Sequence, residues 1–204
     1  MKFLILFAVV VFFGSVDCGD QECFRDVFKE CVKQSPPGKE IQLCDEVKFQ
    51  IDCVARISAK CDMDFKETAE AVKEAAQRVC GGGDTQKLFD EEKDCYWKAI
   101  SDSKCAGPIR EAMKDLETAE KIIKSNKKVC TLFGSFSQCA KQNAKKDCGS
   151  TSDILFDSLY DPLYSLADQI CKELILPADE KDARPDSFGV LNPYMVIAAF
   201  FGHA

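Results

Sequence analysis

The sequence predicts an all-α protein, namely a disulfide-stapled helical bundle made of two tandem six-cysteine modules. Three observations lead to this prediction. Apolar residues recur at helical spacing along most of the chain, no stretch alternates convincingly with the period of a β-strand, and the cysteines follow similar steps in two halves. With 13 cysteines in 204 residues, we expect oxidised sulfur to serve as scaffold.

Residues 1–18 have the features of a secretory signal peptide. Met1 and Lys2 precede an apolar run from 3 to 13, and the small residues Val16 and Cys18 are placed for signal peptidase. The run is shorter than the roughly 20 residues that a membrane-spanning helix needs. Cleavage after Cys18 leaves an even number of cysteines, which fits six disulfides in a secreted, extracellular protein.

The first module, residues 19–84, is expected to contain three helices. The proline pair at 36–37 ends the first of them, because proline cannot continue a helix. The glycine run at 81–83 with Asp84 closes the module as a linker. Apolar stripes place the helices at 21–32, 41–60 and 65–79.

The second module, residues 85–176, repeats this order with one addition. Gly107-Pro108 is expected to break its first helix, and residues 109–128 then form an inserted surface helix that the first module lacks. The middle helix follows at 128–146. The last helix covers 154–176, where Pro162 marks a kink or a break.

Residues 177–204 form a polar spacer followed by an apolar C-terminal tail. This order resembles a glycolipid-anchor signal, with Ser187 or Ala183 as a candidate attachment residue. Asn192 and Pro193 interrupt the apolar run, so an ordinary tail that packs on the helices is at least as good an interpretation.

The cysteine spacing suggests a ladder of disulfides in each module, provided that its three helices run up, down and up. Cys23 and Cys31 are eight residues apart in the first helix, and Cys53 and Cys61 are eight apart in the second. Antiparallel packing therefore favours one set of pairs, although six cysteines permit many others. The favoured pairs are Cys23–Cys61, Cys31–Cys53 and Cys44–Cys80, and then Cys95–Cys148, Cys105–Cys139 and Cys130–Cys171.

Motifs and charge favour neither an enzyme nor a cofactor or metal site. The single histidine, His203, lies at the C-terminus, which leaves hydrolase triads without a base, and no Cys-x2-Cys pair marks a zinc site. A net charge of −7 argues against binding to nucleic acid or to anionic membrane surfaces. Trp97 is expected to pack in the core.

The cysteine rhythm and the apolar positions around it form a pattern that covers residues 23–171. It consists of Cys44, Cys53-Val54, Cys61, Phe65, Val79-Cys80, Gly83-Asp84, Phe89, Cys95-Tyr96, Cys105, Cys130, Cys139, Cys148, Leu166 and Ile170-Cys171. This pattern resembles the insect twenty-seven-kilodalton haemolymph glycoprotein family. The resemblance implies a secreted, all-helical, disulfide-bonded protein of circulating fluid, and it supplies no catalytic residue. Two features depart from the family: the chain has no Asn-x-Ser/Thr acceptor, and its apolar tail is not part of the pattern. The twelve-cysteine extracellular domains of nematodes are a rival resemblance with a poorer match in spacing.

Two functions follow as hypotheses. The first is a secreted extracellular binding or carrier protein for a small hydrophobic ligand, such as a lipid or a hormone. The alternative is an extracellular protein-interaction module, an immune, venom or cell-surface component with a possible glycolipid anchor, that binds its partner through the 109–128 helix. A pocket of a few hundred cubic ångströms in the folded interior, lined by apolar groups, would favour the carrier. Exposure of both faces of the 109–128 helix, without a cavity, would favour the interaction module.

Overall fold

Every regular element in the described part of the chain is a helix. The computed structural model describes residues 20–33, 43–114, 117–148 and 156–177, and none of these residues lies in a β-strand. The predicted all-α, disulfide-stapled fold class is therefore confirmed. The predicted signal peptide at 1–18, the proline pair at 36–37 and the expected C-terminal tail lie outside the described residues.

Three helices of the first module begin and end within two residues of their predicted limits. They are α1 (Gln21–Lys33), α2 (Leu43–Lys60) and α3 (Lys66–Val79). Asp20 caps α1, since its carboxylate accepts a hydrogen bond from the backbone N–H of Cys23 at 2.8 Å. The N–H of Asp20 also donates to the carbonyl of Cys61 at 2.9 Å, so the start of α1 lies beside the end of α2. The two helices are thus antiparallel, as the disulfide ladder requires.

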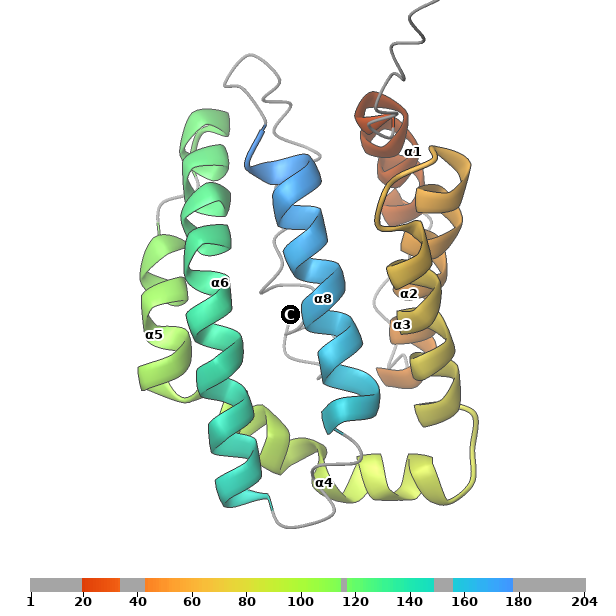
Figure 1. Cartoon of the computed structure of the whole chain (residues 1–204), viewed down its shortest axis with the longest axis vertical. Helices are drawn as coiled ribbons and strands as arrows, with labels where there is room; N and C mark the ends of the chain where they lie inside the picture. The colour runs from red at the N-terminus through yellow and green to blue at the C-terminus, as the bar shows by residue number, and fades with distance from the viewer. Residues whose placement is uncertain (1–19, 34–42, 115–116, 149–155, 178–204) are drawn as a thin grey trace, which may run out of the picture.

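The predicted linker after α3 is a glycine turn. Gly82 and Gly83 have φ angles of 93° and 83°, a region that favours glycine because it has no Cβ. The turn leads into the second module, which consists of α4 (Asp84–Ser101), α5 (Ser103–Ala112), α6 (Ala119–Asp147), a π-helical turn η1 (Phe156–Tyr160), α8 (Asp161–Ile170) and a second π-helical turn η2 (Cys171–Ile175). Figure 1 shows α4 crossing one end of the molecule, with α5 and α6 on one side and α1 to α3 on the other.

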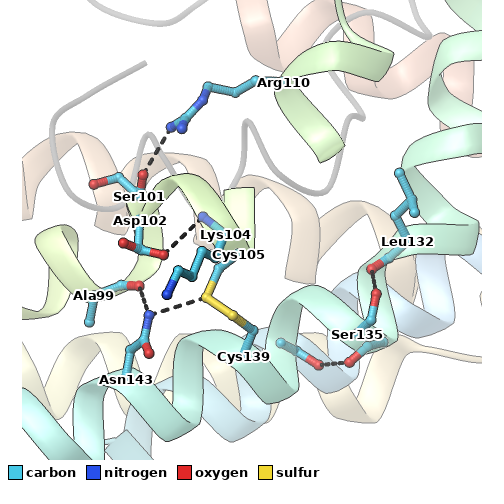
Figure 2. Close-up of a disulfide and its surroundings, with 12 residues drawn as sticks. Ala99, Ser101, Asp102, Lys104, Cys105, Arg110, Leu132, Ser135, Cys139 and Asn143 are labelled. Carbon is cyan, nitrogen blue, oxygen red and sulfur yellow. Dashed lines mark hydrogen bonds between the residues drawn. A yellow bond between two sulfur atoms is a disulfide. The ribbon is translucent and has the colours of Figure 1, made fainter. Parts of the chain in front are cut away.

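The predicted helix break at Gly107-Pro108 is wrong, because Pro108 lies inside α5. The chain turns instead at Asp102, whose carboxylate accepts a hydrogen bond from the N–H of Lys104 at 2.9 Å and so caps α5. Arg110 reinforces the corner by donating to the carbonyl of Ser101 at 3.0 Å (Figure 2). A capped start six residues before the proline fixes the helix, and Pro108 then removes only one backbone hydrogen bond from it.

The predicted inserted helix at 109–128 is also wrong as a single element. α5 ends at Ala112, and α6 begins at Ala119, nine residues before the predicted start of the middle helix. Thr118 sets this start, because its hydroxyl accepts a hydrogen bond from the N–H of Lys121 at 3.3 Å. The two halves of the stretch therefore belong to neighbouring helices that pack against each other.

The kink predicted at Pro162 takes a mild form. Pro162 lies in the first turn of α8, directly after the π-helical turn η1. The backbone of Tyr160 stays in the right-handed helical region, with φ −76° and ψ −42°. Since proline has no N–H to donate, it lies naturally where the hydrogen-bond pattern changes from one helix type to another.

A single hydrophobic core joins the two modules, and α8 lies at its centre. Figure 1 shows α8 between α6 on one side and the α1 to α3 layer on the other, and α8 packs against both α3 and α6. Two hydrogen bonds link η2 to the first module: Gln21 Nε2 donates to the carbonyl of Glu173 at 2.7 Å, and the N–H of Asp64 donates to the Glu173 carboxylate at 3.1 Å. The second module therefore completes the packing of the first.

Candidate functional site

The predicted site residues are the cysteines, and the structure places them at the joints between helices. Four disulfides are described, and all four are pairs that the ladder predicts, with Cα–Cα distances of 5.4 to 5.8 Å: Cys23–Cys61, Cys95–Cys148, Cys105–Cys139 and Cys130–Cys171. Cys53 and Cys80 are also disulfide-bonded. The side chains of their predicted partners, Cys31 and Cys44, lie outside the described part of the structure, so these two pairings stay predictions.

The Cys105–Cys139 bridge holds α5 against α6 in a buried setting. Cys105 is only 3% exposed. Figure 2 shows Asn143 beside the bridge, where its amide nitrogen lies 3.2 Å from Cys105 Sγ and 3.4 Å from the carbonyl of Ala99 at the end of α4. One side chain thus contacts α4, α5 and α6 at their common junction. The geometry of these three helices is fixed both covalently and by hydrogen bonds.

A hollow of about 640 Å³ opens on the surface between the end of α5 and the first half of α6. We call it the lysine-lined hollow. Its lining combines one residue of α5 with six of α6, which are Ala112, Lys121, Lys124, Ser125, Lys127, Lys128 and Thr131. All but Thr131 come from the 109–128 stretch, which the sequence predicts to be an insertion in the second module. The stretch predicted to be an inserted helix is therefore the main wall of a cavity.

The positive charge of this hollow contrasts with the acidity of the whole chain. α6 carries seven lysines against Glu120 and Asp147, a net charge of +5 in a protein of net charge −7. Lys121 pairs with Glu117 at 3.2 Å. No described carboxylate lies within ion-pair distance of the remaining lysines of the hollow, which are Lys124, Lys127 and Lys128.

Lys141, farther along α6, shows what a paired lysine looks like in this helix. Its ammonium group lies 2.7 Å from Asp161 and 3.3 Å from Asp157. The hydrogen bond to Asp161 is the main cause of a raised pKa for Lys141, which stays charged. This lysine links α6 to the start of α8 and has a structural role, whereas the unpaired lysines of the hollow have no such role among the described residues.

Ser125 is a buried polar residue in the wall of the hollow. It is 5% exposed, and its hydroxyl has no hydrogen-bond partner among the described residues. The other hydroxyl side chains of α6 are all satisfied, because Thr131, Ser135 and Ser137 donate to backbone carbonyls three residues earlier at 2.8 to 3.0 Å. A buried hydroxyl without a partner is costly, so Ser125 calls for an explanation.

The buried aromatic residues form the core and offer no reactive group. Tyr96, Tyr160 and Tyr164 gather where α4, η1 and α8 meet, with ring centroids 5.4 and 6.3 Å apart. Burial raises the pKa of Tyr160 and Tyr164 well above that of a free tyrosine, so both stay neutral. Trp97 is partly buried and packs against the core, as predicted.

Sequence reasoning missed the lysine-lined hollow and Ser125. A usable signal was present, because four lysines fall within 121–128 of an otherwise acidic chain.

No group of three or more histidine, cysteine, aspartate or glutamate side chains suited to a metal ion occurs in the described residues. Within the same residues, no helix combines the length and the apolar composition needed to cross a membrane.

Fold and site together define an all-α, disulfide-stapled protein with a cationic hollow on its surface. No family model matches the sequence, and neither the curated proteins nor the solved structures contain a match to it.

Proposed function

We propose that this chain is a secreted extracellular binding or carrier protein whose ligand site is the lysine-lined hollow. The observation that carries the proposal is the hollow itself: its volume of about 640 Å³ lies within the range of small-molecule sites, and it is an open surface hollow, not the interior apolar pocket that the carrier hypothesis expected. Both walls are held by disulfides: Cys105 anchors α5 to α6, and Cys130, next to Thr131, anchors α6 to η2. A site with fixed walls loses little entropy when a ligand binds.

Secretion is supported by the disulfides, which persist in oxidising compartments. The signal peptide at 1–18 is the expected route, and N-terminal sequencing of the secreted protein should find Gly19 first. The same cysteine pattern motivates membership of the insect twenty-seven-kilodalton haemolymph glycoprotein family as a further proposal. Deletion of 188–204, followed by a test for cell-surface retention, decides whether the tail signals a glycolipid anchor.

The lining suits a ligand that is apolar in part. Ala112, the methyl group of Thr131 and the methylene stems of the lysines provide apolar wall, while lysine side chains place their charged ends toward water. The small hydrophobic ligand expected from the sequence would need an additional polar or charged group to use these ends. We therefore propose an amphipathic small molecule.

The test is a steric block of the hollow. Ala112→Trp adds a large ring to the α5 wall, and Gln142→Trp adds the same ring to an exposed position elsewhere on α6. Native mass spectrometry of each protein, isolated from the medium of secreting cells, should show a retained small molecule on the wild type and on Gln142→Trp. Ala112→Trp should have lost it. Absence of any small molecule from the wild type, or its retention by Ala112→Trp, refutes the proposal.

The second candidate is the extracellular protein-interaction module. One observation favours it: Lys124 and Lys128 are exposed at an open hollow and could face an acidic protein surface. The block variant separates the two functions, because an added ring excludes a small ligand while the rim lysines stay in place for a protein partner. An acidic partner protein that binds Ala112→Trp as well as the wild type would establish the interaction module instead.

A further inference from the structure

We infer that the ligand of the lysine-lined hollow is a small organic phosphate, in which an apolar body carries a phosphate group with two negative charges. This inference rests on the proposed function and specifies its ligand. It depends on three features of the hollow, which are the unpaired lysines, the buried hydroxyl of Ser125 and the apolar part of the walls.

The lysines supply more positive charge than a single carboxylate could neutralise. Lys124 lies three residues before Lys127 and four before Lys128, so the three side chains project from the same side of α6 on adjacent turns. Like charges at these spacings destabilise an isolated helix, and the described carboxylates do not relieve them here. An anion with two negative charges would offset this repulsion. Lysine is a common partner of phosphate groups, which it binds as a point charge.

Ser125 adds a neutral donor within the same patch. It follows Lys124 directly and lies three residues before Lys128, so it shares their helical turn. Its hydroxyl, unlike those of Thr131 and Ser135, does not donate to the helix backbone. A phosphate group has three terminal oxygens that accept hydrogen bonds. The Ser125 oxygen is covered in the ligand-free protein, so its side chain would have to rotate toward the hollow to donate to one of them, while ammonium groups face the others.

The size and walls of the hollow indicate an organic phosphate rather than a free inorganic ion. A volume of about 640 Å³ is much larger than one phosphate group needs. Ala112 of α5 and the lysines of α6 line the same hollow, whose volume leaves room for an apolar body beside the phosphate. The phosphate would therefore bind at α6, with the remainder of the molecule against α5.

The test uses 1-naphthyl phosphate as the probe, because it joins an apolar ring to a phosphate monoester. 1-Naphthoate, a monocarboxylate, and 1-naphthol, which is neutral, keep the ring and change the charge. Isothermal titration calorimetry at constant ionic strength should give one site per chain for 1-naphthyl phosphate. We expect 1-naphthoate to bind at least about tenfold more weakly, because each charge-assisted hydrogen bond is worth roughly that factor or more.

Three variants locate the site. Lys124→Gln combined with Lys128→Gln should weaken 1-naphthyl phosphate binding by about tenfold or more, and Ser125→Ala should weaken it by about threefold or more. The control combines Lys98→Gln with Lys146→Gln, two exposed lysines without described ion-pair partners. This control removes the same charge near the other end of α6: Lys146 is 18 residues, or about 27 Å, along α6 from Lys128, and Lys98 precedes Ala99, whose carbonyl contacts Asn143. It should bind the probe within about twofold of the wild type, because long-range charge effects are screened.

Phosphatidylcholine vesicles with and without phosphatidic acid distinguish a phospholipid headgroup from a soluble phosphate. Retention of the protein by the phosphatidic acid vesicles alone, lost in Lys124→Gln with Lys128→Gln, would support the inference with a lipid source. Binding of free 1-naphthyl phosphate without vesicle retention would support it with a soluble source. Equal binding of 1-naphthyl phosphate and 1-naphthoate, or equal weakening by the control pair, overturns the inference.

The outcomes also separate this inference from the proposed function. If native mass spectrometry finds a small molecule that Ala112→Trp loses, while 1-naphthyl phosphate and phosphatidic acid vesicles both fail to bind, the phosphate inference is wrong and the binding function stands. If neither experiment detects a ligand, both fall.

Discussion

Removal of the Cys105–Cys139 disulfide is the sharpest test of the ladder as the source of stability. The change is Cys105→Ala with Cys139→Ala, which leaves both helices intact in sequence. The two cysteines are 34 residues apart, and closing a loop of that length restricts the unfolded chain by about 3.8 kcal/mol at 25 °C in the chain-entropy model. Asn143 also loses its contact with Cys105 Sγ, but its second acceptor, the carbonyl of Ala99, remains.

The neighbouring disulfide reduces this figure. Cys95–Cys148 spans 53 residues and encloses the Cys105–Cys139 loop, so the unfolded chain is already linked around it. With the outer bridge in place, the path between Cys105 and Cys139 contains only the difference of 53 and 34, which is 19 residues. A loop of that length corresponds to about 3.2 kcal/mol. Removal of both bridges should therefore cost about 0.5–1 kcal/mol more than the two single losses added together.

The assay is urea unfolding followed by far-ultraviolet circular dichroism, under conditions that keep the remaining disulfides oxidised. The variant should lose about 3 kcal/mol of unfolding free energy and should keep a helical spectrum. Its m-value should rise, because an unfolded chain with one fewer cross-link exposes more surface. A loss below about 1 kcal/mol with an unchanged m-value would refute the reasoning, since the unfolded state would then not be restrained by this bridge.

Three further predictions concern single side chains. Ser125→Ala should raise the unfolding free energy of the ligand-free protein by about 1 kcal/mol, because it removes a buried hydroxyl that has no hydrogen-bond partner among the described residues. A lower unfolding free energy in the same urea titration would mean that the hydroxyl is satisfied. Burial raises the pKa of Glu173, so the folded protein holds this proton more tightly than the unfolded chain does. The wild type should therefore lose stability relative to Glu173→Gln as the pH rises from about 4 through the folded pKa. Thermal melts of both proteins at several pH values check this, and the same pH dependence in both would exclude it. Gly83→Ala should lower the unfolding free energy by about 1–3 kcal/mol, because φ 83° with ψ −161° is accessible almost only to glycine. The control Gly134→Ala, at an exposed position of α6, should raise the unfolding free energy by about 0.5–1 kcal/mol. A gain in stability at both positions in thermal melts would mean that the turn at Gly83 is not strained.

Most of the helices could be predicted because their signals are local. Apolar residues at helical spacing and the glycine run at 81–83 located α1 to α3 within two residues. The pairing of Cys105 with Cys139 was predicted by analogy with the first module, where Cys23 and Cys31 have the same spacing as Cys53 and Cys61, and the order of the cysteines is again a property of the sequence. Local periodicity and cysteine arithmetic thus carry the fold class and four of the predicted bridges.

The errors arose where a cap competes with a helix breaker. The predicted break rested on Pro108 alone, yet the capping carboxylate of Asp102 sets the start of α5, and the helix tolerates Pro108 at the cost of one hydrogen bond. The same holds for Thr118, which starts α6 inside a stretch whose apolar spacing alone suggests one continuous helix. Both caps are visible in the sequence, but their effect depends on the direction that the following helix takes.

Contacts between distant segments could not be predicted at all. α3 begins at Lys66 without a side-chain cap of its own, and the carboxylate of Glu173, more than 100 residues later, accepts the hydrogen bond from Asp64 at its start. Nothing local to Glu173 distinguishes it from the other acidic residues of the chain. The lysine-lined hollow has the same origin, because Ala112 and Thr131 become neighbours only when α5 turns back along α6.

The net charge of the chain and the charge of its hollow lead to different conclusions about partners, and distance reconciles them. A total of −7 with +5 on α6 leaves −12 on the remaining residues, so an extended polyanion such as nucleic acid meets mostly repulsion. Charges in solution are screened beyond about 8 Å at physiological ionic strength, so an anion in the hollow is affected mainly by the charged groups that line it. A small anion inside the hollow would therefore experience the lysines and little of the acidic surface. The acidity of the whole protein therefore disfavours an extended polyanion, whereas a single phosphate group held inside the hollow meets the lysines first.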